Sequence, residues 1–209
     1  MVLRDVMSLF SGLALAACSV VGVRSGTEEP RYDVVQTVGA LEIRAYGPRI
    51  AAETDAPGAE VAARSEGFRR IAAFIFGANQ GSAKIAMTAP VATAPAEKIA
   101  MTAPVATART ASGWTVRFFM PSEYTMETLP KPTDPRVRIV TVPGETYAVY
   151  RYSGSIGPTE TATAHAELLR LLASTEWKPA GEVMDWFYDP PWTLPPLRRN
   201  EASVPVTKG

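Results

Sequence analysis

The order in which strand patterns and helix patterns follow one another most constrains the fold of this chain. Alternating apolar and polar side chains predict strands at residues 32–37, 41–46, 49–55, 114–120, 137–142, 146–152, about 182–188 and a short one through 204–206. Apolar side chains spaced three and four apart predict two amphipathic helices, over 59–76 and 159–174. We therefore predict one α+β domain of two β–α halves, in which two helices pack on a twisted, mainly antiparallel sheet or distorted β-barrel.

A duplicated stretch lies between the two halves. Residues 84–94 and 98–108 are identical, and both contain the run Met-Thr-Ala-Pro-Val. Within each copy the side chains alternate as in a strand, whereas Pro90 and Pro104 lack the amide hydrogen that a central strand needs. We expect two short extended segments beside the sheet. The alternative is a tandem duplication that only lengthens a loop.

Composition excludes some classes of function. The 209 residues carry 21 Lys and Arg against 21 Asp and Glu, so the basic excess of a nucleic-acid-binding protein is missing. A chain of this length is expected to form one domain with a sizeable core. The single cysteine, Cys18, rules out an intramolecular disulfide, c-type haem attachment and a thiolate metal cluster.

The N-terminus has the pattern of an export signal. Residues 6–17 form an uncharged apolar run that is too short to span a bilayer and that ends in small residues. The Leu-Ala-Ala-Cys run that ends at Cys18 resembles the bacterial lipobox, whose cysteine is acylated and becomes the first mature residue. The alternative is an ordinary secretory signal in which Cys18 has no role.

This segment defines the organisation that we expect. Residues 1–17 are the lipoprotein signal peptide, 18–30 a flexible tether and 31–209 the folded domain. Acylation of Cys18 anchors the protein in a membrane, so we expect it at the cell envelope, facing the periplasm.

Short motifs occur in one order across the rest of the chain. They are Phe76-Gly77-Ala78-Asn79, both Met-Thr-Ala-Pro-Val copies, Phe-Met-Pro-Ser-Glu-Tyr-Thr at 119–125, Glu-Thr-Leu-Pro-Lys-Pro at 127–132, Asp-Pro-Arg-Val at 134–137, Tyr-Asp-Pro-Pro-Trp at 188–192 and Arg-Arg-Asn-Glu at 198–201. From about residue 32 to residue 206 the chain resembles the SOUL haem-binding protein family, whose bacterial members often carry Met-Thr-Ala-Pro-Val twice. The resemblance implies non-covalent binding of haem or another tetrapyrrole, and the fold of small-molecule effector-binding domains.

The resemblance also implies where the tetrapyrrole lies. In animal members it is thought to occupy an exposed groove between the first helix and the chain before the Asp-Pro-Pro motif. Carried onto this sequence, the groove is lined by Phe68, Ile71, Ala72, Ile75, Met184, Trp186 and Phe187. Arg69 beside the helical stripe is the expected partner of a propionate. Ala72 departs from the animal pattern, which has a bulky Met there. The alternative is that the stripe and the aromatic residues pack in the core.

His165 is the only histidine, and therefore the only imidazole available to haem iron as a metal ligand. It falls within the apolar arc of the second predicted helix, next to leucines at 168, 169, 171 and 172. A core histidine with one satisfied nitrogen fits the same position, so both interpretations stay open.

We expect the protein to bind its tetrapyrrole reversibly, as a carrier or buffer, without catalysis. The sequence contains no H-E-x-x-H, P-loop or G-x-G-x-x-G motif. One alternative is an enzyme of the same fold that modifies a small apolar substrate, for which Glu53 and Asp55 form a close acidic pair. Another is an envelope interaction protein whose groove takes a peptide or a lipid. Arg198 and Arg199 are expected to pin the C-terminal segment through ion pairs with Glu201, each worth about 0 to 1 kcal/mol if exposed.

Overall fold

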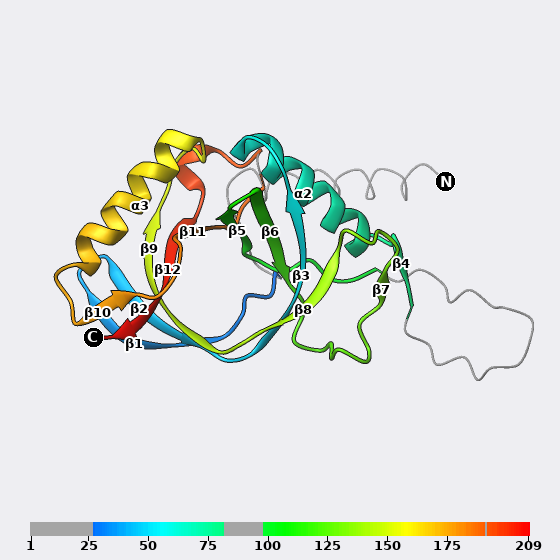
Figure 1. Ribbon diagram of the computed structural model, residues 1–209, viewed down its shortest axis with the longest axis horizontal. Helices are drawn as coiled ribbons and strands as arrows, with labels where there is room; N and C mark the ends of the chain where they lie inside the picture. The colour runs from blue at the N-terminus through cyan, green and yellow to red at the C-terminus, as the bar shows by residue number, and fades with distance from the viewer. Residues whose placement is uncertain (1–26, 82–97, 191) are drawn as a thin grey trace, which may run out of the picture.

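The computed structural model describes residues 27–81, 98–190 and 192–209, and Figure 1 shows how they are arranged. Its elements, in chain order, are β1 (Tyr32–Val38), β2 (Leu41–Tyr46), β3 (Arg49–Ala56), α2 (Glu60–Ile75), β4 (Asn79–Gln80), β5 (Val105–Thr110), β6 (Gly113–Phe119), β7 (Lys131–Pro132), β8 (Arg138–Val142), β9 (Glu145–Tyr152), α3 (Pro158–Leu172), β10 (Trp177–Pro179), β11 (Met184–Phe187), the short 3-10 helix η1 (Pro195–Leu197) and β12 (Asn200–Lys208). The predicted signal peptide, Cys18 and the first copy of the duplicated stretch lie outside the described residues.

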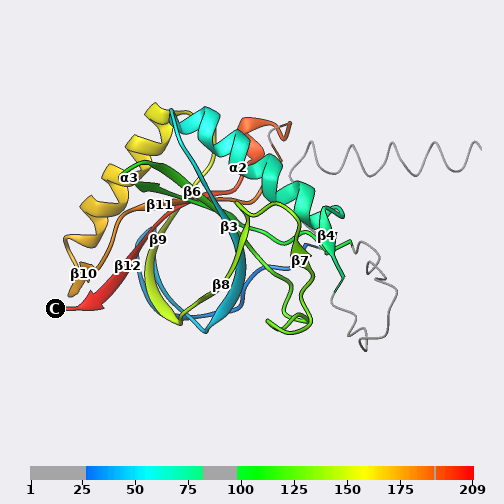
Figure 2. The same cartoon turned by 45° about the vertical axis from the view of Figure 1, so that its right-hand side comes forward.

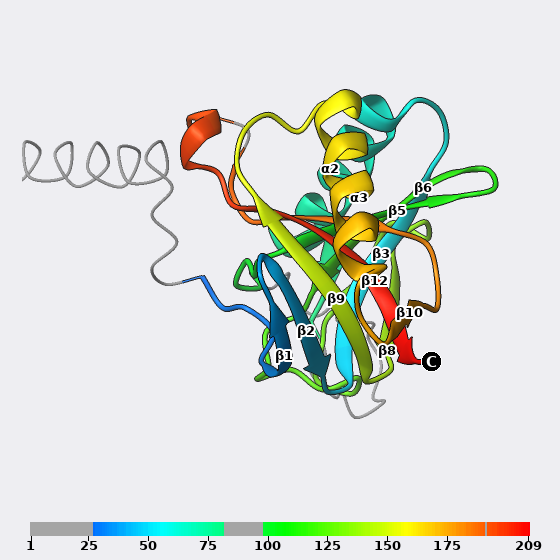
Figure 3. The same cartoon turned by 90° about the vertical axis from the view of Figure 1, so that its left-hand side faces the viewer.

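One curled antiparallel sheet forms the body of the fold. Its strands run in the order β1-β2-β9-β12-β11-β5-β6-β3-β8, and β10 pairs with β12. Figure 2 shows this sheet curling into a half-barrel, and Figure 3 shows α2 and α3 lying over the same side of it. The predicted α+β class, with two helices on an antiparallel sheet, is confirmed. No helix within the described ranges is both long and apolar enough to cross a bilayer.

Helix α2 packs on β3 and β6 through a face centred on Gly67. The buried side of the helix consists of Ala63, Gly67, Ile71, Phe74 and Ile75. A Cβ atom at Gly67 would collide with Val116 of β6, so the glycine lets the helix backbone approach the sheet closely. The apolar face predicted from the sequence included Phe68, whereas the structure buries Gly67 and leaves Phe68 partly exposed. The helix is rotated from that expectation because its closest contact with the sheet is made where no side chain intervenes.

Helix α3 packs on β2, β9 and β12. Pro158 occupies its first turn, where the missing amide hydrogen costs no hydrogen bond. Thr161, Ala164, Leu168 and Leu172 form its buried side. These residues meet a core that includes Leu41, Ile43, Ala148, Ala202 and Val204. Each helix therefore covers its own part of the sheet, as the two β–α halves predicted.

The concave side of the half-barrel is also buried, which the alternation in β2 did not predict. The alternation of apolar and polar residues in β2 predicts that Glu42, Arg44 and Tyr46 face solvent, but Arg44 and Tyr46 are buried. Tyr46 belongs to a concave core with residues from other strands, namely Ala51, Ala103, Ala106, Phe119, Val142, Tyr147, Val149, Trp186 and Tyr188. Because the sheet curls, strands distant in its order face one another across this space.

The second copy of the duplicated stretch joins this concave core. Thr102 and Ala103 are buried, the Thr102 hydroxyl donates to the Phe119 carbonyl, and the Ala103 amide donates to the Glu28 carbonyl at 3.0 Å. Val105 then begins β5, so the copy ends as a strand. This copy is extended, as predicted, but it ends inside the sheet and not beside it, because β5 pairs with both β11 and β6.

Candidate functional site

The eight residues predicted to line a tetrapyrrole groove fall into separate environments. On α2, Ile71 and Ile75 are buried against the sheet, Ala72 is half-buried, and Phe68 remains 37% exposed. Arg69 is exposed and donates to Glu66 Oε2 at 2.6 Å. Of the predicted helical residues, only Phe68, Arg69 and Ala72 are therefore accessible to a ligand.

The predicted residues of β11 point to opposite faces of the sheet. Met184 and Trp186 contribute to the concave core, whereas Phe187 lies on the helix side, where the Arg64 guanidinium is 4.9 Å from its ring centre. The structure thus brings Phe187 toward α2 and separates Trp186 from it by the thickness of the sheet. Successive strand residues face opposite sides, so these two neighbours cannot line one groove.

An exposed apolar stripe runs along one flank of α2. It consists of Val61, Phe68 and Ala72, spaced seven and four residues apart, and continues into Phe76 directly after the helix. Val61 and Phe76 are exposed, and the Phe68 ring packs on that of buried Phe118 with 5.4 Å between ring centres. We call these four residues the α2 stripe.

Two arginines of α2, Arg64 and Arg69, lie beside the α2 stripe. Arg64 is fixed: it donates to Glu60 at 3.2 Å and to the Ile156 carbonyl at 2.7 Å. Arg69 is largely exposed and donates to Glu66 at 2.6 Å and to the Ser65 carbonyl at 3.3 Å, so its guanidinium is able to exchange the exposed Glu66 for another anion at little cost.

His165 lies on α3 and bonds to a buried carboxylate. Its Nε2 is 2.8 Å from Oδ1 of Asp185, which projects from β11 on the helix side of the sheet. The imidazole is partly exposed, whereas Asp185 is almost completely buried. Among the described residues no three His, Cys, Asp or Glu side chains gather as a protein metal site requires.

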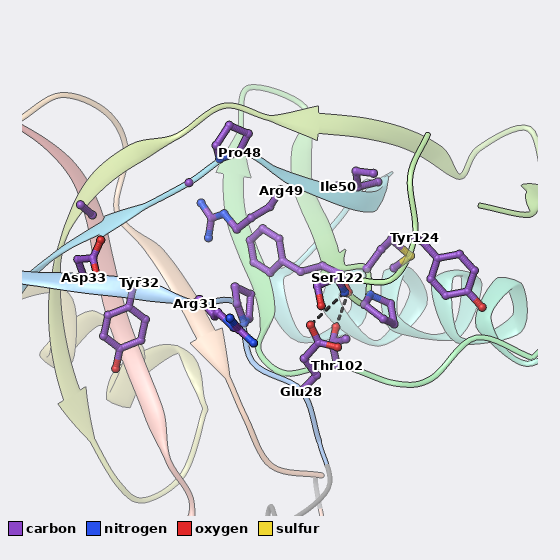
Figure 4. Close-up of a pocket in the computed structure, with 16 residues that line it drawn as sticks. Glu28, Arg31, Tyr32, Asp33, Pro48, Arg49, Ile50, Thr102, Ser122 and Tyr124 are labelled. Carbon is purple, nitrogen blue, oxygen red and sulfur yellow. Dashed lines mark hydrogen bonds between the residues drawn. The ribbon is translucent and has the colours of Figure 1, made fainter. Parts of the chain in front are cut away.

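A cavity of about 470 Å³ opens on the concave side, and Figure 4 shows its lining. We call it the concave cavity; its walls come from the chain before β1, the β2–β3 turn and the end of β6. Arg31, Tyr32, Arg49, Ile50, Phe119, Met120, Pro121 and Tyr124 are among its lining residues. In Figure 4 the Arg49 side chain points toward the Tyr32 and Arg31 end, away from Ile50 and Tyr124.

Arg49 is held between aromatic rings. Its guanidinium carbon lies 4.4 Å from the ring centre of Tyr46 and 4.5 Å from that of Phe119. Burial lowers the pKa of Arg49 from its ordinary value, because a charge in this apolar setting loses hydration. No pattern in the sequence singles out this residue. Arg49 follows the Gly47-Pro48 break, and its aromatic partners lie on strands far apart in the chain.

Glu201 is the centre of a buried ion network, not part of the exposed segment that was predicted. Arg44 binds it with two hydrogen bonds, at 2.9 and 3.2 Å, Arg199 at 2.9 Å and the Tyr188 hydroxyl at 2.7 Å. Burial alone would raise the pKa of Glu201, but the bonds and charges of Arg44 and Arg199 bring it below its usual value. Both carboxylate oxygens of Glu201 accept hydrogen bonds from within the protein, so Glu201 has a structural role.

The acidic pair considered for catalysis is likewise neutralised. Glu53 accepts bonds from Arg117 at 2.7 Å and from Arg138 at 3.1 Å, and Asp55 pairs with Arg138 at 2.9 Å. The bonds from Arg138 and Thr115 lower the pKa of Asp55. These carboxylates form a cross-strand ion-pair cluster.

Three solved structures share the overall architecture. The crystal structure of the EcmrR C-terminal domain has a TM-score of 0.56 at 11% identity, covering 85% of this chain and 99% of that one. The EcmrR chain in a cryo-EM structure of the EcmrR–DNA complex in EcmrR-RPo gives 0.55 at 12%, covering 99% and 67%. A hydrolase from Listeria innocua gives 0.52 at 14%, covering 83% and 94%. Identities this low show the fold alone, which this chain shares with the EcmrR C-terminal domain.

The family comparison covers nearly all the described chain. The SOUL heme-binding protein model matches residues 27–205, which include the second Met-Thr-Ala-Pro-Val copy, the α2 stripe and the Glu201 network. No curated protein matches the sequence. The motif-based resemblance is thus confirmed at the level of the family, and membership suggests haem binding. This chain belongs to the SOUL haem-binding protein family.

Proposed function

We propose that this protein binds haem or a related tetrapyrrole reversibly along the α2 stripe. The family match suggests the class of ligand, and the observation that supports the location is the run of exposed Val61, Phe68 and Phe76 with half-buried Ala72 between them. A tetrapyrrole is a flat apolar plate with charged propionates, so it requires an apolar surface with a cation beside it. Residues of both kinds are present on this flank of the helix.

Each residue of the proposed site has a physical role. Phe68 offers a ring face that Phe118 supports from below, and Ile71 and Ile75 hold the helix on the sheet. Arg69 would exchange Glu66 for a propionate. Haem brings its iron and its visible absorption, and the chain binds and orients the macrocycle.

His165 is the residue we propose as iron ligand. Its Nε2 is engaged with Asp185 at 2.8 Å, which leaves Nδ1 as the nitrogen for a metal. A carboxylate on the far nitrogen is the usual support of a metal-binding imidazole, because it fixes the ring and raises its basicity. The same contact equally suits a structural histidine, so a spectrum must distinguish the two.

We further propose that the protein acts at the cell envelope, as a tetrapyrrole carrier or buffer tethered through lipidated Cys18. The support is the signal-like run of residues 6–17 and the lipobox-like end at Cys18. Metabolic labelling with a fatty-acid analogue should mark the wild-type chain in the membrane fraction. Cys18→Ser should remove the label and release the protein from that fraction; a labelled or membrane-bound variant contradicts the anchor.

Titration of the purified chain with haemin tests the binding site. We expect a saturable Soret shift for the wild type, and about tenfold weaker binding for Phe68→Ala, which is about 1.4 kcal/mol. Val34→Ala is the control, since Val34 is 53% exposed on the edge strand β1. Equal losses in both variants would contradict the α2 location, and no saturable shift in the wild type would contradict tetrapyrrole binding.

A further inference from the structure

Buried donors without acceptors gather on the concave side of the sheet. Within the described part of the chain, Nε and Nη2 of Arg49 and Nε1 of Trp186 have no hydrogen-bond partner. An unpaired buried donor costs about 1 to 3 kcal/mol. Arg49 and Trp186 line one narrow space together with Tyr46 and Tyr188. Donors collected at one place, with no acceptor, indicate a ligand that supplies oxygen atoms.

This narrow space continues from the concave cavity. Pro30, Tyr32, Arg49 and Phe119 line both. This space is narrower than the concave cavity. Tyr32 stands on β1, which has β2 as its only neighbour in the sheet. A ligand oxygen would reach Arg49 and Trp186 when Tyr32 moves aside on this edge strand.

The guanidinium of Arg49 is suited to an anion. The rings of Tyr46 and Phe119 cover it without neutralising it, at 4.4 and 4.5 Å. Tyr147, whose hydroxyl donates to Glu145 at 2.5 Å, also hydrogen-bonds Arg49, and the Glu145 carboxylate acts on Arg49 through space, so Nε and Nη2 of Arg49 remain for a ligand. A carboxylate placed on the planar fork of an arginine makes two parallel hydrogen bonds.

The remainder of the cavity is largely apolar. Ile50, Met120, Pro121 and Tyr124 line the end opposite the Arg49 guanidinium, as Figure 4 shows for Ile50 and Tyr124. The acids in the lining are Glu28, whose Oε1 accepts from the Ser122 amide at 3.0 Å, and exposed Asp33; Arg31 adds a second cation. The cavity thus has a cationic inner end and an apolar body.

We propose that the concave cavity is a second ligand site, which binds an apolar carboxylate through Arg49 and the Trp186 indole. The Arg49 end of the site lies on the face of the sheet opposite the α2 stripe, whereas Ile50, Met120 and Tyr124 belong to the core beneath α2. The inference goes beyond the binding proposed at the α2 stripe. The carboxylate belongs either to a free apolar acid or to a tetrapyrrole propionate.

Three probes of one shape test the charge that the cavity selects. Calorimetric titration of the full chain should show 4-phenylbutyrate binding at least tenfold more tightly than 4-phenylbutanol or 4-phenylbutylamine. Arg49→Gln should abolish this preference, whereas Arg170→Gln, which removes an exposed arginine of α3, should keep it. The proposal is overturned if the alcohol or the amine binds as well as the acid, if none binds, or if Arg49→Gln retains the preference.

A measurement on the wild-type chain makes the test independent of how the Arg49 variant folds. The chain has 4 tryptophans, so its indole N–H resonances are few, and Trp186→Phe assigns the one in question. That resonance should move on adding 4-phenylbutyrate and stay in place with the alcohol; no movement with the acid overturns the proposal.

Competition with haemin identifies the source of the carboxylate. Displacement of 4-phenylbutyrate by haemin in the Phe68→Ala variant assigns the cavity to a tetrapyrrole propionate. Simultaneous binding of haemin and 4-phenylbutyrate assigns the cavity to a separate acid. Both results require that 4-phenylbutyrate binds in the cavity. Failure of acid binding with intact haemin binding would remove this inference and leave the α2 proposal standing.

Discussion

Arg44 and Glu201 are joined by two hydrogen bonds across the centre of the sheet, and neither side chain is appreciably exposed. The pair connects β2 to β12, which are not neighbours because β9 lies between them. Arg44 also reaches Glu42 at 2.8 Å, and Arg199 links Glu201 to Glu29 at 3.0 Å. Charges of both signs therefore balance on the concave side near β2 and β12.

Removing the charge of Glu201 should destabilise the fold strongly. In Glu201→Gln, Arg44 and Arg199 remain buried without their central anion, and breaking a buried pair costs about 3 to 5 kcal/mol. Urea denaturation measures the loss. Glu167→Gln is the control, since its partner Arg170 is exposed, and its midpoint should stay unchanged. A similar midpoint for both variants would show that the buried network is dispensable.

Stability should fall in alkali, because several tyrosines are buried. Burial raises the pKa of Tyr46 to about 12, and it also raises those of Tyr147 and Tyr152. Above the ordinary value of about 10 the unfolded chain loses its proton first, so the unfolding free energy decreases from about pH 10 toward 12. Tyr46→Phe should make this decrease shallower in a pH series of urea titrations; an unchanged slope would contradict the assignment.

A methyl group at Gly67 should separate α2 from the sheet. Gly67→Ala places a Cβ atom against Val116, and overpacking of this kind costs about 1 to 3 kcal/mol. The matched substitution Gly47→Ala meets nothing within 4 Å, so it should be neutral or slightly stabilising. Thermal denaturation compares the two. Equal melting temperatures would mean that the helix moves away from the sheet at no cost.

His165→Ala should affect both stability and spectrum. The buried Asp185 carboxylate loses its bond to Nε2, and an unsatisfied buried acceptor costs about 1 to 3 kcal/mol. If His165 is the iron ligand, the Soret band of the haem-loaded variant also shifts. His165→Gln retains a donor near the position of Nε2 for Asp185 and separates the two effects. A wild-type Soret spectrum in both variants would rule out His165 as the ligand.

Local patterns predicted the elements well, because strand and helix periodicities need only neighbouring residues. The strand expected at 41–46 is observed as Leu41–Tyr46, and the helix expected at 159–174 as Pro158–Leu172. The final strand was underestimated: Asn200–Lys208 pairs with β9, β10 and β11, and its pattern is obscured because polar Glu201 and Ser203 are buried.

The candidate site was less predictable, since it depends on which residues meet across the half-barrel. Phe68 was identified as a site residue, but the sequence could not show that Ile71 turns inward, because that follows from the absence of a side chain at Gly67. Arg49 was missed altogether. Its partners Tyr46, Phe119 and Trp186 come from three strands, and no spacing along the chain relates them.

One peptide of β6 separates the two proposed ligand sites. Phe118 supports Phe68 on the outer face, and the next residue, Phe119, covers Arg49 on the inner face. Any ligand that displaces this strand from one side also moves the wall of the other site. The affinities of the two sites are then linked reciprocally. An acid that tightens tetrapyrrole binding is itself bound more tightly, by the same factor, when the tetrapyrrole is present. An acid that loosens tetrapyrrole binding is bound less tightly by the same factor.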